Sequence, residues 1–456
     1  MRATKRLLFI AFLSCSACLA LQSAIPRSGV HTWETSAEQT GATQTVSVPY
    51  TPGLDVSAMD KTVDPCVDFY AYSCGGWQKQ NPIPANQASW SVGARLTEQT
   101  REVLRDILEK AADDPHRSSI NQKIGDYYSS CMDESAINAA GVGALKADLE
   151  RIAALRTKAD LAGYLAHFHP QDIGVYFGSS ALFRFGSSQD VKNSAEVIAE
   201  VDEGGLGLPD RDYYLKDDAR SKELRSKYVV HVQKMLELIG EKPEGAAADA
   251  QTVMRIETAL GKGMLTNVER RDPKATYHRM NVNELQALTP SFAWKQYFAG
   301  YGLNNPQSLN VAAPEFFRTM EATIRAEDLG SWEAYLRWHL VHAQARWLSS
   351  PIVNEDFNFY GRTLTGQREL GTRWERCIRF MYPLNDAVGE AYVASAFSSK
   401  AKERASKMAR QIERAMEQDI RGLTWMSDPT KQEALTKLHD VVVMIGTPTG
   451  GATTLG

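Results

Sequence analysis

The stretch DPCVDFYAYSCGGW, residues 64–77, holds two of the six cysteines in this chain of 456 residues. Cys66 and Cys74 lie eight positions apart, and Cys131 and Cys377 follow much later, so no two of the four form the C-x-x-C pair of a zinc knuckle. What these thiols bind depends on the compartment, because disulfides persist in oxidising environments and are rare in the cytosol.

The N-terminus indicates export. The apolar run Leu7–Leu21 follows three basic residues, Arg2, Lys5 and Arg6. The run is too short and too rich in cysteine for a typical membrane span, so we predict that residues 1–24 are a signal peptide and that the protein is periplasmic or extracellular. A lipid anchor on Cys18 is the alternative, although the leucine that such signals prefer three residues earlier is missing. Export makes the four later cysteines disulfide candidates.

The composition is that of an ordinary globular chain. It is 43% hydrophobic and 23% charged, which suffices for two or three domain-sized cores. A formal net charge of −4 gives no reason to expect nucleic acid as a partner. Residues 25–55 are rich in Ser, Thr, Gly and Pro without a sustained period, so we predict a flexible spacer between the export signal and the folded domain.

From Val56 onward the dominant pattern is helical. Apolar residues fall on one stripe of segment 98–112. In segment 400–423 they recur at three- and four-residue steps, at Ala401, Ala405, Met408, Ile412, Met416, Ile420 and Leu423. Further amphipathic segments are residues 221–239, 249–260, 283–288, 319–325 and 331–348. Strand-like alternation is scarce, with residues 174–185 and 440–445 as the best cases. We therefore predict a mainly α fold whose apolar stripes pack into the core.

The nine histidines do not form a recognisable metal site. None belongs to an H-E-x-x-H helix, and no G-x-S-x-G elbow or phosphate-binding glycine loop is present. His339 and His342 lie three residues apart on a predicted helix, and His167 and His169 lie in a predicted loop, but neither pair has an identifiable third ligand. We interpret all four as core or surface histidines. The residues alone predict an exported helical protein without a visible active site.

Six segments, in order along the chain, resemble one family. They are DKTVDPCVDFYAYSCGGWQKQNPIP (60–84), IGDYYSSCMDESA (124–136), GGLGLPDRDYYL (204–215), RRDPKATYHRM (270–280), FNFYGRTLTGQRELGTRWERC (357–377) and LTWMSDPTKQEALTKL (423–438). Together they resemble the N-terminal domain of neprilysin-like zinc metalloendopeptidases, the M13 family, over residues 56–448.

This resemblance implies a large helical domain, with its core at residues 96–438, that faces a thermolysin-like catalytic domain across a closed cavity admitting small peptides. The zinc ligands and the general base of the family lie in a later H-E-x-x-H helix followed by E-x-x-x-D, and this chain contains no H-E-x-x-H. We therefore expect no catalytic residue and no zinc site here, although the complete family protein binds zinc. Residues 449–456 are expected to be an aberrant or truncated tail.

The resemblance also implies roles for the four cysteines. The cysteines that match Cys131 and Cys377 pair with each other in the family and close the helical domain. Those that match Cys66 and Cys74 pair with partners near the far C-terminus, so in this chain both are expected to be orphans that could link two copies as a dimer.

One substrate-facing position departs from the family pattern. Ser89 stands where the family usually carries an arginine that holds the C-terminal end of the substrate, and Trp90 occupies the adjacent aromatic position. Both are candidates for a peptide-binding wall, with simple packing as the alternative for Trp90. Arg95 lies nearby in the sequence.

Two functions remain open at this stage. In the first, the chain is the N-terminal part of an exported peptidase, inactive alone, whose partner is the missing catalytic domain and whose substrates are peptides. In the second, it is a stand-alone helical module that binds peptides or partners without cleaving them.

Overall fold

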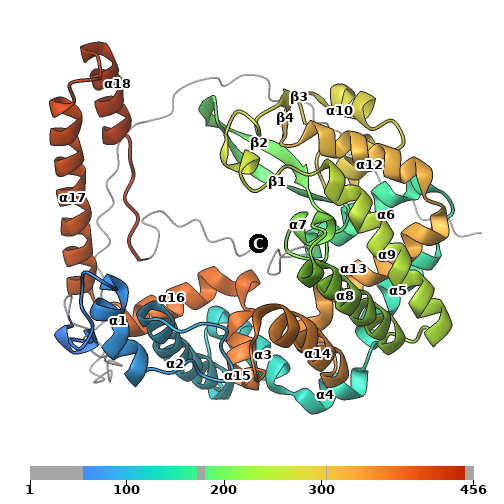
Figure 1. Ribbon diagram of the computed structural model, residues 1–456, viewed down its shortest axis with the longest axis horizontal. Helices are drawn as coiled ribbons and strands as arrows, with labels where there is room; N and C mark the ends of the chain where they lie inside the picture. The colour runs from blue at the N-terminus through green and yellow to red at the C-terminus, as the bar shows by residue number, and fades with distance from the viewer. Residues whose placement is uncertain (1–54, 172–179, 305, 447–456) are drawn as a thin grey trace, which may run out of the picture. The chain divides into compact units, whose positions relative to one another are not determined.

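The computed structural model describes residues 55–171, 180–304 and 306–446 (Figure 1). It is mainly helical with one small sheet, which confirms the predicted fold class. The expected signal peptide (1–24), all but the last residue of the expected spacer (25–55) and the expected tail (449–456) lie outside the described residues. None of the described helices is long and apolar enough to cross a bilayer.

The helices fall into three runs along the chain, within residues 69–168, 212–344 and 350–439. The first run contains α1 (Phe69–Gln80), α2 (Val92–Asp113), α3 (Ser119–Met132), α4 (Glu134–Ala140), α5 (Lys146–Ala153) and α6 (Leu161–Phe168). The second contains α7 (Asp212–Leu215), α8 (Ala219–Leu238), α9 (Pro243–Gly263), α10 (Val282–Leu288), α11 (Trp294–Gly300), α12 (Pro314–Ala326) and α13 (Leu329–Gln344). The third contains α14 (Ser350–Asp356), the π-helix η7 (Phe357–Leu364), α15 (Arg373–Arg379), α16 (Asn385–Ala396), α17 (Ser399–Gly422) and α18 (Asp428–His439).

The sheet has four strands in the order β1-β2-β4-β3. Its strands are β1 (Phe183–Asp190), β2 (Asn193–Glu203), β3 (Arg279–Met280) and β4 (Leu309–Val311). The first two form an antiparallel hairpin in which Phe183 lies opposite Glu203, whereas β2 and β4 are parallel, with Ala199 opposite Leu309. Only the hairpin is long; β3 and β4 add two and three residues.

Both strand predictions need correction. Of residues 174–185, only Phe183 to Phe185 lie in a described strand, and residues 174–179 lie outside the described part. The prediction for residues 440–445 is wrong: α18 ends at His439, and the residues after it form no strand. Val442 and Met444 are 79% and 74% exposed, so this β-branched segment has no sheet to pair with among the described residues.

Most helices of the second run pack around one large core. Its central polar group is Glu257 of α9, which has no solvent exposure. The Glu257 carboxylate accepts hydrogen bonds from the Tyr214 hydroxyl at 2.7 Å, the Tyr228 hydroxyl at 2.8 Å and the Trp338 indole at 3.1 Å. Burial raises the pKa of Tyr228 well above its usual value, so this hydroxyl stays protonated and can donate. These bonds connect α7, α8 and α13 to α9.

The motif GGLGLP is held against the same core by tyrosine hydroxyls. The Tyr335 hydroxyl donates to the Gly205 carbonyl at 3.0 Å, and the Tyr360 hydroxyl donates to the Gly207 carbonyl at 2.8 Å. A Cβ on Gly207 would lie 2.0 Å from the Tyr228 hydroxyl oxygen, so only glycine fits at this position. The glycines of the motif therefore serve close packing in this fold.

The apolar stripe of α17 is the main departure from the predicted core. Met408, Ile412 and Met416 are 59%, 61% and 50% exposed, and Ile420 is the only buried member of the helix within the described structure. The helix itself was predicted correctly, but the expectation that its stripe packs into the core is wrong. Within the described residues, α17 packs chiefly against α18, which leaves the rest of its apolar face uncovered.

Candidate functional site

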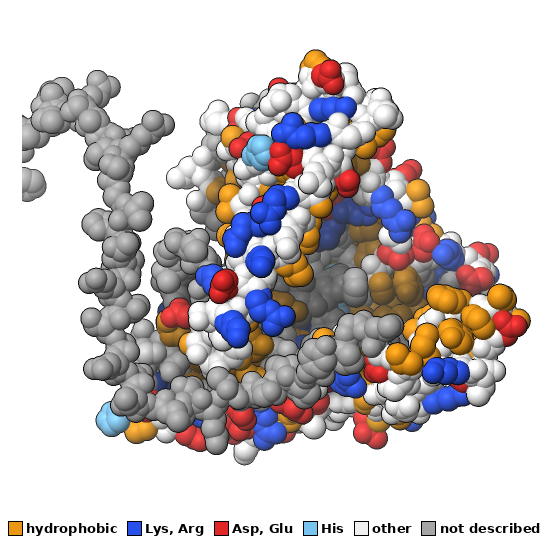
Figure 2. Space-filling model, turned by 90° about the vertical axis from the view of Figure 1, so that its left-hand side faces the viewer, with side chains coloured by type: hydrophobic (Ala, Val, Ile, Leu, Met, Phe, Trp, Pro, Cys, Tyr) orange, Lys and Arg blue, Asp and Glu red, His pale blue; other side chains and the backbone are white. Residues whose placement is uncertain are grey.

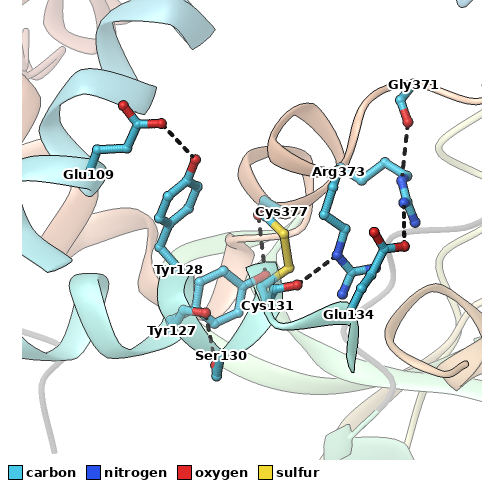
Figure 3. Close-up of a disulfide and its surroundings, with 10 residues drawn as sticks. Glu109, Tyr127, Tyr128, Ser130, Cys131, Glu134, Gly371, Arg373 and Cys377 are labelled. Atoms are coloured by element: carbon cyan, nitrogen blue, oxygen red, sulfur yellow. Dashed lines mark hydrogen bonds and ion pairs between the residues drawn. A yellow bond between two sulfur atoms is a disulfide. The ribbon is translucent and has the colours of Figure 1, made fainter. Parts of the chain in front are cut away.

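A disulfide joins Cys131, at the end of α3, to Cys377 in α15 (Figure 3). The two Cα atoms lie 5.8 Å apart, within the usual range for a disulfide, and the bond spans 246 residues of sequence. Cys377 is fully buried in a second, smaller core, where Cys131 packs beside it. The disulfide therefore fixes the C-terminal part of the described chain to the helices near its start.

Polar side chains around the disulfide hold the same two helices together. The Arg373 guanidinium donates to the Cys131 carbonyl at 2.6 Å, and the Tyr127 hydroxyl donates to the Cys377 carbonyl at 3.3 Å. Arg376 of α15 lies beside Glu134 of α4, with 3.5 Å between Nη2 and Oε1. Burial lowers the pKa of Arg376 from its ordinary value, so the cost of desolvating this guanidinium is partly offset by the carboxylate of Glu134.

The other two described cysteines are free thiols. Cys66 is exposed in the turn before α1, and Cys74 is partly buried within α1. The glycines after Cys74 allow close packing, since a Cβ on Gly76 would lie 2.6 Å from the Met59 carbonyl oxygen. An ion pair of 2.6 Å between Lys79 Nζ and Asp60 Oδ2 also fixes the preceding segment against α1.

Large apolar side chains beside the free thiols are exposed. Val67, Phe69 and Tyr70 have 82%, 69% and 66% of their surface accessible, whereas Tyr72 and Trp77 are partly buried. Isolated exposed apolar residues are common in folded proteins, but three within four positions form a patch typical of interaction surfaces.

Ser89 and Trp90 precede α2. Ser89 is exposed, Trp90 is partly buried, and no described contact assigns either of them to a ligand. Nearby, the Ala85 carbonyl accepts hydrogen bonds from the backbone N–H groups of Arg368 and Glu369 at 3.0 and 2.9 Å. The backbone at Ala85, four residues before Ser89, is therefore held against the loop before α15.

The four singled-out histidines have structural partners. His339 Nε2 lies 3.1 Å from Glu257 Oε1, and His342 stacks on the Trp338 ring with centroids 5.0 Å apart. His167 lies 2.7 Å from Asp148, and His169 bridges the Tyr297 hydroxyl and the Ala181 carbonyl. The last two residues lie at the end of α6 and in the following 3-10 turn, not in the predicted loop.

A zinc ion needs at least three protein ligands that converge on one point. In residues 55–171, 180–304 and 306–446, no three His, Cys, Asp or Glu side chains come together in this way. The described residues therefore do not fit a zinc centre.

The exposed stripe of α17 runs beside basic side chains. Figure 2, which looks onto this helix, shows hydrophobic side chains along its length next to Lys and Arg. The stripe consists of Met408, Ile412 and Met416, and exposed Trp425 follows the end of the helix. We call this set the α17 face. Like the patch at Val67, Phe69 and Tyr70, the α17 face exposes apolar side chains in the way that is typical of interaction surfaces.

Comparisons with known proteins identify the family. The model of "Peptidase family M13" matches residues 65–448. Endothelin-converting enzyme 1 of Mus musculus is 30% identical over 403 residues, which cover 86% of this chain and 52% of that protein. Neprilysin-3 of Drosophila melanogaster is 27% identical over 409 residues, which cover 86% of this chain and 52% of that protein.

 The chain spans about half the length of the curated relatives it matches.

Solved structures share the fold. A crystal structure of Mycobacterium tuberculosis zinc metalloprotease ZMP1 in complex with an inhibitor superposes with a TM-score of 0.77 at 29% identity, covering 85% of this chain and 58% of that one. PEPO from Lactobacillus rhamnosis superposes with a TM-score of 0.72 at 20% identity, covering 84% of this chain and 60% of that one, and supports the fold alone. The family match over most of the chain and the shared fold together show that this protein belongs to peptidase family M13, of which it contains the N-terminal part.

Proposed function

We propose that this chain is the N-terminal half of an exported zinc metalloendopeptidase that cleaves small peptides in its complete form. The observation that carries the proposal is the family match over residues 65–448 in a chain that spans about half the length of its curated relatives. One similar protein of solved structure is a zinc metalloprotease. Residues 1–24, with basic residues before an apolar run, support export to the periplasm or the extracellular space.

In this proposal the chain supplies a helical wall beside the peptide and does not supply the catalytic centre. Zinc polarises a carbonyl and activates water in hydrolases of this kind. The described residues do not fit such an ion. The proposal places the zinc ligands in the H-E-x-x-H helix that the family resemblance implies for the complete protein. Ser89 and Trp90 remain the candidates for contact with the peptide.

Exposed features of the described chain support a missing partner domain. The α17 face, the patch at Val67, Phe69 and Tyr70, and the segment 441–444 all present apolar side chains to solvent. Cys66 and Cys74 are free thiols, whereas Cys131 and Cys377 form a disulfide. Burial of these surfaces against a catalytic domain would remove apolar area from water. In this proposal, cysteines of the catalytic domain form disulfides with Cys66 and Cys74.

A stand-alone binding module is the second candidate. It is favoured by the observation that two hydrophobic cores and a disulfide are complete within the described residues. Such a module would bind peptides or protein partners through the same apolar surfaces without cleaving them. The two candidates differ in what the gene encodes after this chain.

Reading the gene beyond codon 456 in all three frames separates the two candidates. The peptidase proposal expects an H-E-x-x-H motif with a downstream E-x-x-x-D, because one helix must carry two zinc ligands and a general base. An unrelated gene directly after this chain would contradict the proposal and favour the binding module.

A further inference from the structure

Among the described residues, the outer edge of β1 has no strand beside it. In the order β1-β2-β4-β3, β1 pairs with β2 on one side, and the described residues place no strand on the other side (Figure 1). A free strand edge presents a row of backbone N–H and C=O groups that can pair with another extended chain. The register between Phe183 and Gln189 is regular, and the only irregularity lies at the tip, between Gln189 and Asp190.

Among the described residues, the features that usually block strand pairing are confined to the two ends of this edge, at Arg184 and at the irregularity between Gln189 and Asp190. Natural edge strands carry charged side chains, proline or bulges that block a second chain. Here the central residues are Gly186, Ser187 and Ser188, and nothing lies within 4 Å of the position of a Cβ on Gly186. Arg184 is the nearest charged residue on β1, but its guanidinium is bound to Asp202 on the β2 side, at 2.6 Å. The middle of β1 is therefore open to an approaching backbone.

The hairpin is fixed at both ends, so the edge is preorganised. At the tip, the Asp190 carboxylate accepts hydrogen bonds from the Tyr277 hydroxyl at 2.8 Å and from Arg279 Nη1 at 2.6 Å. At the base, Phe183 is fully buried and lies edge-on to Phe292. A surface that is rigid before binding loses little conformational entropy when a ligand adds to it.

We propose that the free edge of β1 binds an extended peptide by strand addition, so that the sheet gains a fifth strand. The occupant is a peptide because strand addition needs only a second extended backbone, and the proposed function supplies peptides as substrates. The small side chains at positions 186–188 place few restrictions on the peptide sequence. Phe185 is partly buried with its ring edge-on to Tyr301 at 4.7 Å, so it offers an aromatic contact for one peptide side chain.

This inference rests on the proposed function only for the identity of the occupant. The test uses the full chain and a peptide of eight residues, the length of β1, with a composition of Thr, Val, Ser and Lys that favours extended structure. Hydrogen–deuterium exchange is measured with and without saturating peptide. We expect the outward-facing backbone amides of residues 184–189 to become protected when the peptide is bound.

Two matched peptides test the backbone pairing directly. N-methylation of every residue removes all backbone N–H donors from the peptide and should weaken binding about tenfold or more, since several backbone hydrogen bonds are lost. N-methylation of alternate residues leaves one peptide edge intact, so this version should still bind. Equal affinities for all three peptides would overturn the proposal.

Two proline variants provide the matching test on the protein. Successive N–H groups of a strand point to opposite edges, so one of Ser187→Pro and Ser188→Pro removes an outward donor and the other removes a donor to β2. We expect one variant to retain the circular dichroism spectrum and the melting temperature of the parent but to lose peptide binding. Retained binding in both variants would contradict the proposal.

Three further outcomes are decisive. A peptide that binds without protecting β1 would overturn this inference but leave the proposed function intact. Protection of β1 that increases with protein concentration in the absence of peptide would assign the edge to a second copy of the chain and also overturn it. Failure of the complete protein to cleave any peptide would instead refute the proposed function.

Discussion

His339 Nε2 lies 3.1 Å from Oε1 of Glu257, and neither side chain has any solvent exposure. The same carboxylate accepts hydrogen bonds from two tyrosine hydroxyls and one indole. A histidine that the sequence offered as a weak metal candidate is therefore part of a buried network that connects α9 and α13. The network accounts for His339 without a metal ion.

Removal of the Glu257 carboxylate should destabilise the large core. Glu257→Leu would leave four buried groups without their acceptor, and we expect the free energy of unfolding to fall by about 3–5 kcal/mol. Glu257→Gln retains one acceptor oxygen and should cost less. Glu244→Gln, at an exposed position of the same helix, is the matched control and should change stability by less than about 0.5 kcal/mol. Urea denaturation measures all three, and equal stabilities for Glu257→Leu and the control would contradict this role.

The disulfide should stabilise the small core through loop closure. Replacing Cys131 and Cys377 together by serine should lower the free energy of unfolding by about 2–5 kcal/mol, because the bond closes a very long loop in the unfolded chain. The matched control replaces Cys66 and Cys74, which form no bond in this structure. Peptide mapping of unreduced protein should recover the 131–377 cross-link. A cross-link between Cys66 and Cys74, with free thiols at 131 and 377, would refute the assignment.

His231 should make the fold less stable in mildly acidic solution. Its ring is buried against Phe359, its Nδ1 lies 3.1 Å from Glu355 Oε1, and Lys234 lies on the other oxygen of Glu355. Burial lowers the pKa of His231, with Glu355 acting in the opposite direction. Between the lowered folded pKa and the unfolded value near 6.5, the unfolded state binds more protons, so stability falls as pH falls.

The change that tests this pH dependence is His231→Gln. Denaturation midpoints at pH 5 and pH 7.5 should differ less in this variant than in the parent, because the group that binds a proton only on unfolding is gone. His116→Gln, at an exposed histidine, should keep the dependence of the parent. An unchanged pH dependence in His231→Gln would refute the role of this residue.

The free thiols should link copies of the isolated chain. Cys66 is exposed beside an apolar patch, and oxidising conditions favour disulfide formation between accessible thiols. We expect covalent dimers on non-reducing gels and binding of a hydrophobic dye. Replacing both cysteines by serine should remove the dimers and leave the helical circular dichroism signal unchanged. A monomer without reactive thiols or dye binding would favour the stand-alone module.

Helical periodicity predicted much of this fold because it depends on local pattern. The segments around α2, α8, α9 and α17 were all recognised, since apolar residues recur on one face of each. β2 was missed, because its alternation is interrupted by Ala and Glu residues and its neighbour β4 lies more than a hundred positions away. Sheet pairing of this kind depends on distant residues, and a sequence window does not contain them.

The candidate site could be predicted only in part for the same reason. Whether the stripe of α17 is buried depends on what packs against it, and periodicity alone does not contain that information. The sequence analysis also did not predict the ion pair between Asp190 and Arg279 that fixes the hairpin. Asp190 lies at the turn between β1 and β2, so only its place in a turn is visible in the local sequence. The partner lies 89 positions away, which no local motif reveals.

The most direct test of the account is zinc content and peptide cleavage by purified residues 25–456, measured beside the complete protein. We expect the complete protein to hold stoichiometric zinc and to cleave small peptides until a chelator is added, whereas residues 25–456 should bind no stoichiometric zinc and leave the same peptides intact. Chelator-sensitive cleavage by residues 25–456 alone would contradict the central claim and would direct attention first to His339 and His342.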